Sequence, residues 1–539
     1  MEAWDVVIIG EGHAAMRSAI AAKKEGAAVL MLSYVGPNNS GNDTDCGIAA
    51  TISEPSTKDH RNDTIRSGDF LCDQNIVNSR TSLAVEIVAE LEQWGVNFRR
   101  DNKGLPLMRL LPGHGKPRVA DCGDSTSREV HQVLLDQCEK NGVVRRADSH
   151  VVKLIHSNNA VNGLICLDLG SGTVNAIQAK SIIIADGGFE GAWDGQSSGG
   201  WGMHLAQNIG ASLRDMEFQN WTPFSIADSN ISLPLNLLGE GAILQGPNDV
   251  SGSPSEMAEI MSKEDGWSVD MAKIDKNNLP WFAGTNKLVS TRLGLDTSFE
   301  PIPVEAKINS IIGGIAIDES GRVLSGGWDK IIPGLFSCGA ASCSGFHGGG
   351  QATGNNLLEE IVSGSLAGAS AAQFAKSSEY SGTKELLDAA DISDGSINAD
   401  LDYSNSKIRA GAVRNTLSQI MSTHMGMNRD EKGLSKAVEA LGTLMESSNQ
   451  LSLDQTNSLL MNTNIVENYR LQVMVSLSQN CVDAAINRKE SRGTHNRLDF
   501  DGRDDGNYLK HSMISSSGEL SWIELMKSAG GNWILAPEE

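Results

Sequence analysis

Short apolar runs that end in glycine recur at three distant places along the chain. They are "WDVVIIG" at residues 4–10, "SIIIADGG" at 181–188 and "IIPGLFSCG" at 331–339. Each run is too short for a buried helix and is nearly continuous in its apolar character, which is typical of a strand buried on both faces. We therefore expect an α/β fold with a doubly wound, Rossmann-like parallel sheet that binds its ligand where the glycine-ended strands finish.

The first of these strands leads into a glycine-rich turn and then a helix. Gly10, Gly12 and Ala15 form a G-x-G-x-x-A pattern, which alanine-rich helical spacing follows as far as Gly26. In this pattern the first glycine allows a tight turn, the second lets a pyrophosphate approach the backbone, and the third position packs the helix against the strand. The pattern predicts a dinucleotide site. Ser33 stands at the end of the second strand, where a carboxylate for the ribose is expected, so NAD is not favoured.

A second glycine-rich turn, "GFHGGGQATGNN" at residues 345–356, precedes an apolar-periodic helix that should begin near Asn355. The amides at a helix N-terminus carry partial positive charge, which stabilises a reduced, anionic flavin ring. Three glycine-ended strands that converge on one sheet edge suit an extended dinucleotide. The sequence therefore favours FAD, with its adenosine end near Gly10 and its ring near the second turn.

The rest of the chain reads differently. Residues 405–490 hold long stretches with helical apolar spacing and no glycine-ended strand, which indicates a helical bundle. Residues 378–406 are polar, acidic and rich in turn formers, so we interpret them as a linker. The chain shows no internal repeat.

Composition narrows the functional class. The chain has 539 residues, 40% of them apolar, and 57 are glycine, which is enough for two or three domains with sizeable cores. Lys and Arg number 44 against 67 Asp and Glu, giving a net charge of −23. This charge argues against nucleic acid or an anionic membrane surface as the main partner.

Eight cysteines lie scattered along the chain, and the spacing of Cys338 and Cys343 does not match a metal knuckle. We expect buried reduced thiols and no metal site. No apolar run approaches the roughly 18 residues that span a bilayer. The first strand follows Met1 so closely that we expect no signal peptide, a cytoplasmic location, and membrane attachment only through a partner.

Longer pieces of the sequence resemble a known family. "IIGEGHAAMRSAIAA", "DCGIAAT", "MEFQNWTPF", "IIGGIAID", "IPGLFSCGAASCSGFHGGGQATGNNLLEEIVSGSLAG" and "RKESRGTHNRLDFDGRDDGNYLKHSM" occur in the order and spacing of the flavoprotein subunit of succinate dehydrogenase and fumarate reductase. The resemblance covers nearly the whole chain. Its last piece, with Arg503, Asp504, Asp505 and His511, is similar to the tail of the complex-forming members.

The resemblance implies a layout and partners. It implies an FAD-binding domain at 1–224 plus 307–377, an inserted capping domain at 225–306, a helical domain at 405–490 and a small C-terminal domain at 491–539. It also implies an iron–sulfur partner subunit, a small-molecule substrate, and attachment to the inner face of a membrane only through other subunits.

The family clamps a dicarboxylate with Arg and His side chains, and the matching positions here are uncharged. The clamping arginine falls on Gln351, the histidine of the H-x-x-x-G-G-I motif on Asn309, and the histidine of the proline step on Thr222. A Thr-Glu pair and the arginine after it fall on Pro234, Leu235 and Leu238. We find no counterpart of the proton-relay arginine. Gln and Asn can hydrogen-bond a carboxylate without the electrostatic attraction of an Arg clamp.

The flavin positions also differ at the ring end. The histidine that the family uses for covalent attachment falls near Ser40, the acid of its T-G-D-G motif on Gly199, and a glutamate after the third strand on Ala340. We therefore expect non-covalent FAD. The cofactor contacts implied by the fingerprint and the resemblance are Gly10, Gly12, Ala15, Ser33, Ser40, Gly47, Ala185, Gly187, His347, Asn355 and Leu357.

Two interpretations stay open. The chain is an active FAD-dependent oxidoreductase with an altered substrate, or a catalytically silent flavoprotein-like subunit with a structural or electron-transfer role. His347 either tunes the flavin or is a hydrogen-bonded structural histidine, and we expect His13 at the surface. Trp221, Phe224 and Leu238 either line an apolar substrate pocket or fill an abandoned one. We expect Arg492 and His495 to pack domains together.

Overall fold

The computed structural model describes residues 1–34, 46–157, 160–194, 198–229, 231–402, 407–454 and 458–537. Ser40 lies outside the described residues, so its predicted place near the flavin stays a prediction. All eight cysteines lie within them and are buried thiols. In the described ranges, no helix is both long and apolar enough to cross a membrane.

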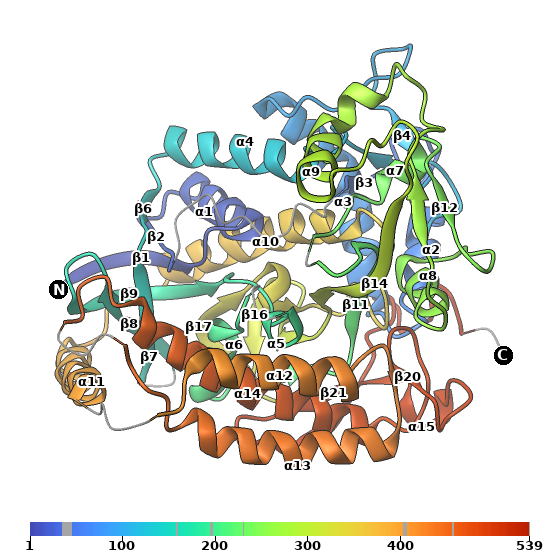
Figure 1. Ribbon diagram of the computed structural model, residues 1–539. Coiled ribbons are helices and arrows are strands. Elements are labelled where there is room, and N and C mark those ends of the chain that lie inside the picture. The colour runs from blue at the N-terminus through green and yellow to red at the C-terminus, as the bar shows by residue number, and fades with distance from the viewer. Residues whose placement is uncertain are drawn as a thin grey trace.

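A parallel sheet forms the centre of the molecule (Figure 1). Its strands run in the order β17–β9–β1–β2–β6, so the first strand of the chain lies in the middle and the order reverses beside it. Their bounds are β1 Glu2–Ile9, β2 Val29–Leu32, β6 Val144–Arg146, β9 Thr173–Ile184 and β17 Ile331–Ser337. This is the doubly wound topology, which confirms the predicted fold class. All three glycine-ended runs are strands of this sheet.

Three antiparallel strands extend the sheet. β7 Ser149–Ser157 pairs with β8 Ala160–Asp168, and β8 pairs with the first half of β9. On the other side, β16 Arg322–Leu324 pairs with β17. The N-terminal half of β9 therefore belongs to an antiparallel meander, while its C-terminal half lies in the parallel sheet and ends beside β1.

Each face of the sheet supplies one hydrophobic core. Val6 and Ile8 of β1 pack with α1 His13–Lys24, α3 Gln74–Trp94, α4 Thr126–Lys140 and α10 Asn355–Lys376. Val7 and Ile9 point to the opposite face, as the two-residue period of a strand requires. They belong to the core that also contains the helices α12 Ala410–His424, α13 Glu431–Ser448 and α14 Thr463–Asn487. Figure 1 shows α1, α4 and α10 above the sheet and α12, α13 and α14 below it.

Helices α1 and α10 lie in close contact, and two glycines allow it. A Cβ atom at Gly364 would lie 2.6 Å from the carbonyl oxygen of Ala14, and one at Gly368 would lie 2.1 Å from that of Ser18. No larger residue fits at either position without moving the backbone of α1. The two helices therefore pack backbone against backbone, as one rigid pair on the same face of the sheet.

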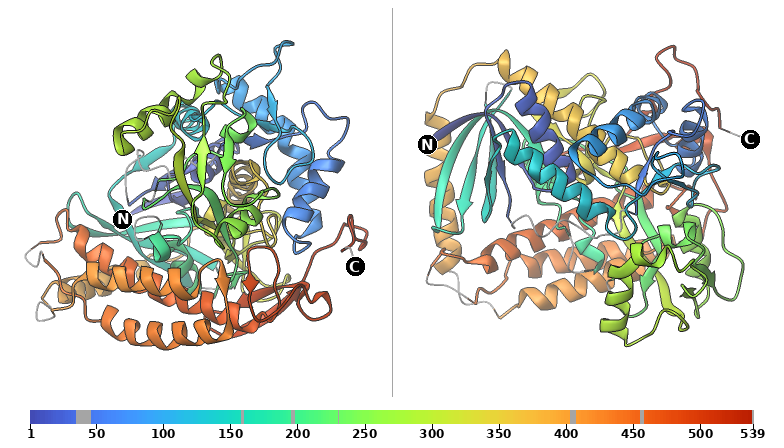
Figure 2. Two further views of the ribbon diagram at one scale, coloured as in Figure 1. Left: turned by 45° about the vertical axis from the view of Figure 1, so that its right-hand side comes forward. Right: turned by 90° about the horizontal axis from the view of Figure 1, so that it is seen from above.

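A separate lobe is inserted after β10 Leu213–Arg214. Two long strands lead into and out of it, β11 Gln219–Ile226 and β14 Ile302–Ile311, which pair with each other. The rest of the lobe consists of α7 Asn236–Gly239, β12 Ile243–Gln245, α8 Pro254–Met261, β13 Ser268–Asp270, a 3-10 turn at Leu279–Phe282 and α9 Ala283–Leu293. It has its own core, which includes Phe224, Leu235 and Phe282. Figure 2 shows this green lobe at one edge of the molecule.

The helical segment contains α12 Ala410–His424, α13 Glu431–Ser448 and α14 Thr463–Asn487, in agreement with the predicted bundle. The linker predicted for residues 378–406 is wrong over most of its length. Lys384–Asp402 form helix α11, which packs on β8 and β9 through the buried Leu386 and Ile397. Two apolar contacts with the sheet outweigh the polar composition, because packing rather than propensity stabilises most helices in proteins.

The C-terminal residues complete a second sheet. Its order is β18 Ser342–Cys343, β15 Gly314–Ala316, β10 Leu213–Arg214, β21 Lys510–Ile514 and β22 Leu520–Glu524. The smaller elements are β3 Ile48–Ala49, α2 Lys58–Ser67, β4 Met108–Arg109, β5 Val119–Ala120, α5 Gly191–Asp194, α6 Trp201–Asn208, a 3-10 turn at Gly339–Ala341, β19 Asn428–Arg429, β20 Asn496–Arg497 and α15 Asp505–Tyr508. Strands from the middle and the end of the chain thus share one sheet.

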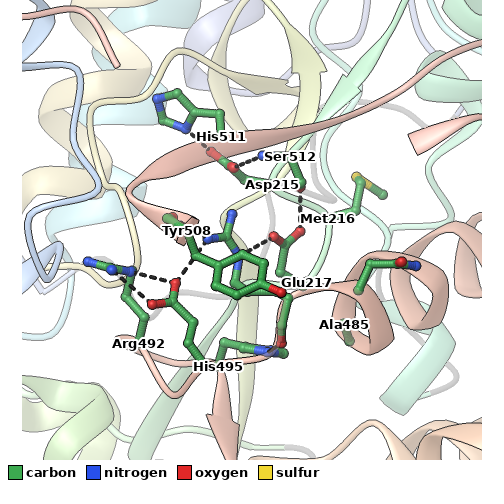
Figure 3. Close-up of polar contacts among 12 residues, drawn as sticks. Asp215, Met216, Glu217, Ala485, Arg492, His495, Tyr508, His511 and Ser512 are labelled. Atoms are coloured by element: carbon green, nitrogen blue, oxygen red, sulfur yellow. Dashed lines mark hydrogen bonds and ion pairs between the residues drawn. The ribbon is translucent and has the colours of Figure 1, made fainter. Parts of the chain in front are cut away.

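A buried ionic cluster joins these parts (Figure 3). The Glu217 carboxylate accepts hydrogen bonds from Arg488 Nε at 2.6 Å and Ser512 Oγ at 2.7 Å. Glu490 accepts from Arg488 Nη1 at 3.0 Å and from Arg492 Nε at 2.7 Å. These two arginine side chains are fully buried. Buried charges of this kind are strongly destabilising when one partner is removed.

His511 occupies the other end of the cluster. Its Nδ1 lies 2.6 Å from Asp215 Oδ2 and its Nε2 lies 3.3 Å from Asp73 Oδ1. Burial alone would lower the pKa of His511, but the two carboxylates overcome it and raise the pKa to about 9. Asp73 also pairs with Arg214 at 3.3 Å. The imidazolium is therefore charged at neutral pH.

The raised pKa of His511 predicts a loss of stability in alkali. The charged His511 adds to the free energy of unfolding. This stabilisation is fully present below 6.5, the pKa of histidine in the unfolded chain, and is lost as the pH rises through about 9, because the unfolded chain releases the proton first. A shift of this size corresponds to about 3 kcal/mol. Thermal unfolding between pH 6 and 10 should show a drop in Tm that His511→Gln lacks. The exposed His156→Gln variant should follow the wild type, and an identical pH profile for all three proteins would contradict the assignment.

Candidate functional site

The turn after β1 contains two glycines, and each is needed for a different structural reason. Gly10 has φ +125°, and a Cβ atom there would lie 2.1 Å from the carbonyl oxygen of Ala185 at the end of β9. Gly12 is the N-cap of α1, makes no side-chain capping bond, and a Cβ atom there meets none of the described atoms within 4 Å. Gly10 is thus required by the protein itself. Gly12 faces open space in front of a helix N-terminus, which fits a phosphate group.

The ends of the three glycine-ended strands β1, β9 and β17 lie next to one another, as predicted. The Ala185 amide donates to the Ile9 carbonyl at 2.8 Å, and the Cys338 amide donates to the Ile184 carbonyl at 3.1 Å. Gly187 follows with φ +92°. Gly47 lies against β5, where a Cβ atom would be 2.4 Å from the side chain of Val119. The three strand ends thus lie together at one edge of the sheet, beside the space in front of Gly12, which is where a doubly wound sheet binds an extended dinucleotide.

Ser33 has a carboxylate partner that the sequence did not reveal. Its hydroxyl donates to Glu11 Oε2 at 2.6 Å, and Glu11 Oε1 accepts from Arg145 Nε at 3.1 Å. The acid at this end of the site thus comes from the fingerprint turn rather than from the end of β2. An acidic residue between the two glycines of the fingerprint was the available signal.

His13 is also different from its prediction, since it is buried rather than at the surface. Its Nδ1 lies 2.9 Å from Glu360 Oε2 on α10, and its Nε2 lies 3.0 Å from the Ser127 carbonyl oxygen. The surface prediction took no account of α10, which packs on this face of α1. His13, the first residue of α1, thus joins the start of α1 to the second turn of α10 and to α4.

Helix α10 begins at Asn355, as predicted, after Gly354 with φ +83°. The Asn355 side chain is already engaged, since its Nδ2 donates to Thr64 Oγ1 at 2.9 Å and its Oδ1 lies 2.8 Å from His60 Nε2. The Leu357 side chain is in the core. Both residues can offer a ligand only their backbone, and their role as flavin contacts stays a prediction.

The second glycine-rich turn is held from two sides. The Gly349 amide donates to the Gly68 carbonyl at 2.8 Å, and the Thr494 amide donates to the Gly349 carbonyl at 2.7 Å. A Cβ atom at Gly493 would lie 2.2 Å from the Gly349 oxygen. The C-terminal tail that contains Arg492 and His495 therefore fixes the turn that precedes Gln351.

Gln351 and His347 line a narrow cavity in front of α10. Its other walls include Ile311, Ala340 and Glu360. His347 Nδ1 is buried and has no hydrogen-bond partner among the described residues. Burial lowers the pKa of His347 to about 3, so the ring is neutral. An unpaired buried ring nitrogen favours a role towards a ligand over a satisfied structural histidine.

Asn309 lies at an irregularity of β14. Trp221 is opposite Ile308 and Asn220 is opposite Ser310, so Asn309 is the extra residue of a β-bulge. Its Oδ1 is buried without a hydrogen-bond partner among the described residues. Ile311, two residues further on, lines the same cavity as Gln351. The structure thus brings the positions of Asn309 and Gln351 to one region.

The other predicted substrate positions do not line the cavity beside Gln351. Thr222 is buried on β11, and its hydroxyl accepts from the Phe224 amide at 3.3 Å. Leu235, Leu238 and Phe224 pack in the core of the inserted lobe. Leu238 and Phe224 therefore serve the packing of this lobe.

Three cations in or beside the lobe are paired with carboxylates. Arg99 Nη1 lies 2.6 Å from Glu240 Oε1, and Arg109 pairs with the same carboxylate. Lys263 is exposed and pairs with Glu259 at 2.9 Å. None of these residues lines the cavity beside Gln351.

Glu190 adds a carboxyl group that the sequence analysis missed. Its Oε2 is buried with no hydrogen-bond partner among the described residues, next to Gly188 and the side chain of Ile311. Burial raises the pKa of Glu190 to about 7, and that of Asp186 to about 6. The signal was an acid directly after a glycine-ended strand. The described charges around this end of the site are thus acidic.

The fold and the site define a class of protein: a dinucleotide-binding flavoprotein with a lobe inserted beside the carboxyl edge of its sheet. The family described as FAD binding domain matches residues 5–357, and the one described as fumarate reductase flavoprotein C-term matches residues 414–528. The chain belongs to the flavoprotein family of succinate dehydrogenase and fumarate reductase, and it is an oxidoreductase of that type with an FAD-binding domain.

Relatives match along the full chain. The fumarate reductase flavoprotein subunit of Haemophilus influenzae is 27% identical over 94% of this chain and 91% of its own length. The succinate dehydrogenase flavoprotein subunit of Rickettsia felis is 26% identical over 95% and 93%. A solved Escherichia coli quinol fumarate reductase subunit has 25% identity and a TM-score of 0.90 over 100% of this chain and 99% of its own. The fold also occurs in adenylylsulfate reductase of Archaeoglobus fulgidus, with 15% identity, a TM-score of 0.77, and coverage of 99% and 97%.

The two glycines give a matched pair of predictions. Gly12→Ala should leave the Tm of the apoprotein nearly unchanged but lower FAD affinity by at least about tenfold, because only the phosphate meets the new methyl group. Gly10→Ala should destabilise the apoprotein by about 1–3 kcal/mol, because its φ and its contact with Ala185 are both unfavourable. Flavin fluorescence titration and thermal unfolding measure the two effects. Equal losses of apoprotein stability in the two variants would refute this distinction.

Proposed function

We propose that the protein is an FAD-dependent oxidoreductase that passes electrons between a small substrate and an iron–sulfur partner subunit, and that it does not turn over succinate or fumarate. The observation that carries the proposal is the absence of a described cation around the cavity of Gln351, combined with the buried carboxyl group of Glu190. FAD, when bound, accepts or donates the hydride. The chain supplies orientation and charge.

The chain binds and positions FAD through its backbone. Gly12 and the N-terminus of α1 would offer amides to the phosphates, and the N-terminus of α10, which packs on α1, would offer amides to the ring. Glu11, Ser33 and Arg145 border the adenosine end. The partly positive start of α10 favours a reduced ring, since its first amides have no side-chain cap.

The side chains at the ring end of the site do not suit a dicarboxylate, because they are neutral or acidic. An Arg clamp neutralises each carboxylate of succinate, whereas Gln351 and Asn309 offer only neutral hydrogen bonds. Glu190 becomes ionised as the pH rises through about 7, and then repels an anion. Such a pocket favours a neutral substrate.

The proposal predicts no measurable turnover of succinate or fumarate. Losing a charge-assisted bidentate contact costs on the order of 2 to 5 kcal/mol, and several such losses act together. Dye-linked succinate oxidation and fumarate reduction by the purified protein test it, with a fumarate reductase as the positive control. Turnover within about tenfold of that control would overturn the assignment of the clamp positions.

The variant Gln351→Arg sharpens this test. One restored cation should not rescue activity, because the opposite clamp and the proton relay are still missing and residues acting as a unit are not additive. Gln351→Glu is a matched control for folding at the same position. If Gln351→Arg alone restored succinate or fumarate turnover, the missing arginine at position 351 would be the only defect of the substrate site.

We propose that the FAD is held without a covalent bond, because the family's attachment histidine falls near Ser40, where this sequence has no histidine. Acid precipitation should leave all yellow colour in the supernatant. Flavin fluorescence in the protein band of a denaturing gel would contradict this, since only a covalent adduct survives denaturation.

A second candidate is a subunit that keeps the fold without the chemistry. The intact buried ionic cluster, together with uncharged substrate positions, is what favours it. The two candidates differ in one measurement: a neutral substrate that bleaches the bound flavin supports the oxidoreductase, and a protein that never takes up flavin after reconstitution supports the silent subunit.

We propose that the protein works within a complex at the cytoplasmic face of a membrane, attached through its partners. The segment from Glu490 to His511 resembles the complex-forming members of the family, and a reduced flavin needs an electron acceptor. Affinity purification from the native cell should recover an iron–sulfur protein, detected by its iron and acid-labile sulfide. A monomer that is fully active with a soluble acceptor would refute the need for a partner.

A further inference from the structure

We propose that a second small-molecule site, distinct from the flavin and substrate positions, lies between the inserted lobe and the helical segment, and that it binds a neutral aromatic molecule with a carbonyl-type hydrogen-bond acceptor. The cavity there has a volume of about 640 Å³. Cavities of roughly 300 to 1,000 Å³ are typical of small-molecule sites. Its walls come from α5, β11 and β14, the end of α8, α12 and the turn before β19.

Two tryptophans make the apolar part of this cavity. Trp193 and Trp221 are 4% and 7% exposed, and Ile308, Ala306 and Met427 complete the apolar lining. Trp193 is fixed in place, since its Nε1 donates to the Met425 carbonyl at 3.0 Å. Rigid indole faces bind planar rings well, because little conformational entropy is lost on contact.

Trp221 supplies an unused hydrogen-bond donor. Its Nε1 is buried and has no hydrogen-bond partner among the described residues. An indole nitrogen can only donate, so a ligand that satisfies it must carry an acceptor. Buried polar groups without a partner are rare and often mark a ligand site. This donor is why the proposed ligand carries a carbonyl-type oxygen.

The charges in the lining argue for a neutral ligand. Lys307 Nζ lies 2.9 Å from Glu305 Oε1 and donates to the Ser229 carbonyl at 2.6 Å, so its charge is already balanced. Asp194 adds one carboxylate to the lining, and the remaining polar residues are Ser262, Ser418, Ser422 and Asn428. An anion therefore finds no free cation here.

The cavity is separate from the proposed substrate positions. Trp221 and Ile308 line it and lie opposite each other on paired strands, whereas Thr222 and Asn309, the next residues on those strands, do not line it. A ligand in this cavity thus contacts the two strands that carry Thr222 and Asn309 without contacting those two residues.

The test compares three fluorinated probes on the full-length, FAD-loaded protein by ¹⁹F NMR titration. 4-Fluoroacetophenone has the ring and the acceptor, 4-fluorotoluene lacks the acceptor, and 4-fluorobenzoate is an anion. We expect the ketone to bind at least about fivefold more tightly than either of the others. No binding of the ketone up to its solubility limit, or equal binding of all three probes, would overturn the proposal.

Variants locate the site. Trp221→Phe keeps an aromatic ring and removes the donor, so it should abolish the preference for the ketone over the toluene. Ser422→Trp places a large side chain in the cavity and should abolish binding, whereas Trp4→Phe on β1, outside the cavity, should change nothing. Ketone binding that survives Ser422→Trp would overturn the location. If that variant does not fold, a crystal soaked with 4-bromoacetophenone decides, since its anomalous peak must lie between Trp193 and Trp221.

Discussion

The pairing of buried arginines with Glu217 and Glu490 is the constraint on which the arrangement of the molecule depends. Arg488 connects these two carboxylates and also donates to the carbonyls of Tyr508 and Lys510. Residues near 215, 490 and 510 are far apart in the chain, yet each must be in place for the other charges to be satisfied. Because an unpaired buried charge costs several kcal/mol, these segments are expected to fold and unfold together.

The same cluster reaches the functional site through the tail. Arg492 donates to the Asp69 carbonyl at 2.9 Å, and Gly493 and Thr494 contact Gly349 in the glycine-rich turn. The position of Gln351 therefore depends on residues about 140 positions later in the chain. Substitutions in this tail will affect the ring end of the site even though they touch neither substrate nor flavin.

The sequence allowed the central sheet and the cofactor turn to be predicted because both depend on local signals. Continuous apolar runs, the glycines at 10 and 12, and the start of α10 at Asn355 all follow from residues next to each other. Glu11 was missed and His13 was placed wrongly because their partners, Arg145 and Glu360, lie more than 100 residues away in the chain. The same applies to α11, whose Leu386 and Ile397 pack on strands that no local pattern connects to it. The cavity between Trp193 and Trp221 also forms only when five separate segments meet.

The two glycines of α10 have a consequence for how the site can change. Gly364 and Gly368 hold α10 directly on the backbone of α1, so the separation of the two helix N-termini is set by helix contact and not by the loops around them. The relative position of these two helix starts is therefore set independently of the inserted lobe. Residues that select a substrate can be exchanged while the cofactor keeps its place, which makes the chemistry of this chain separable from its ability to carry a flavin.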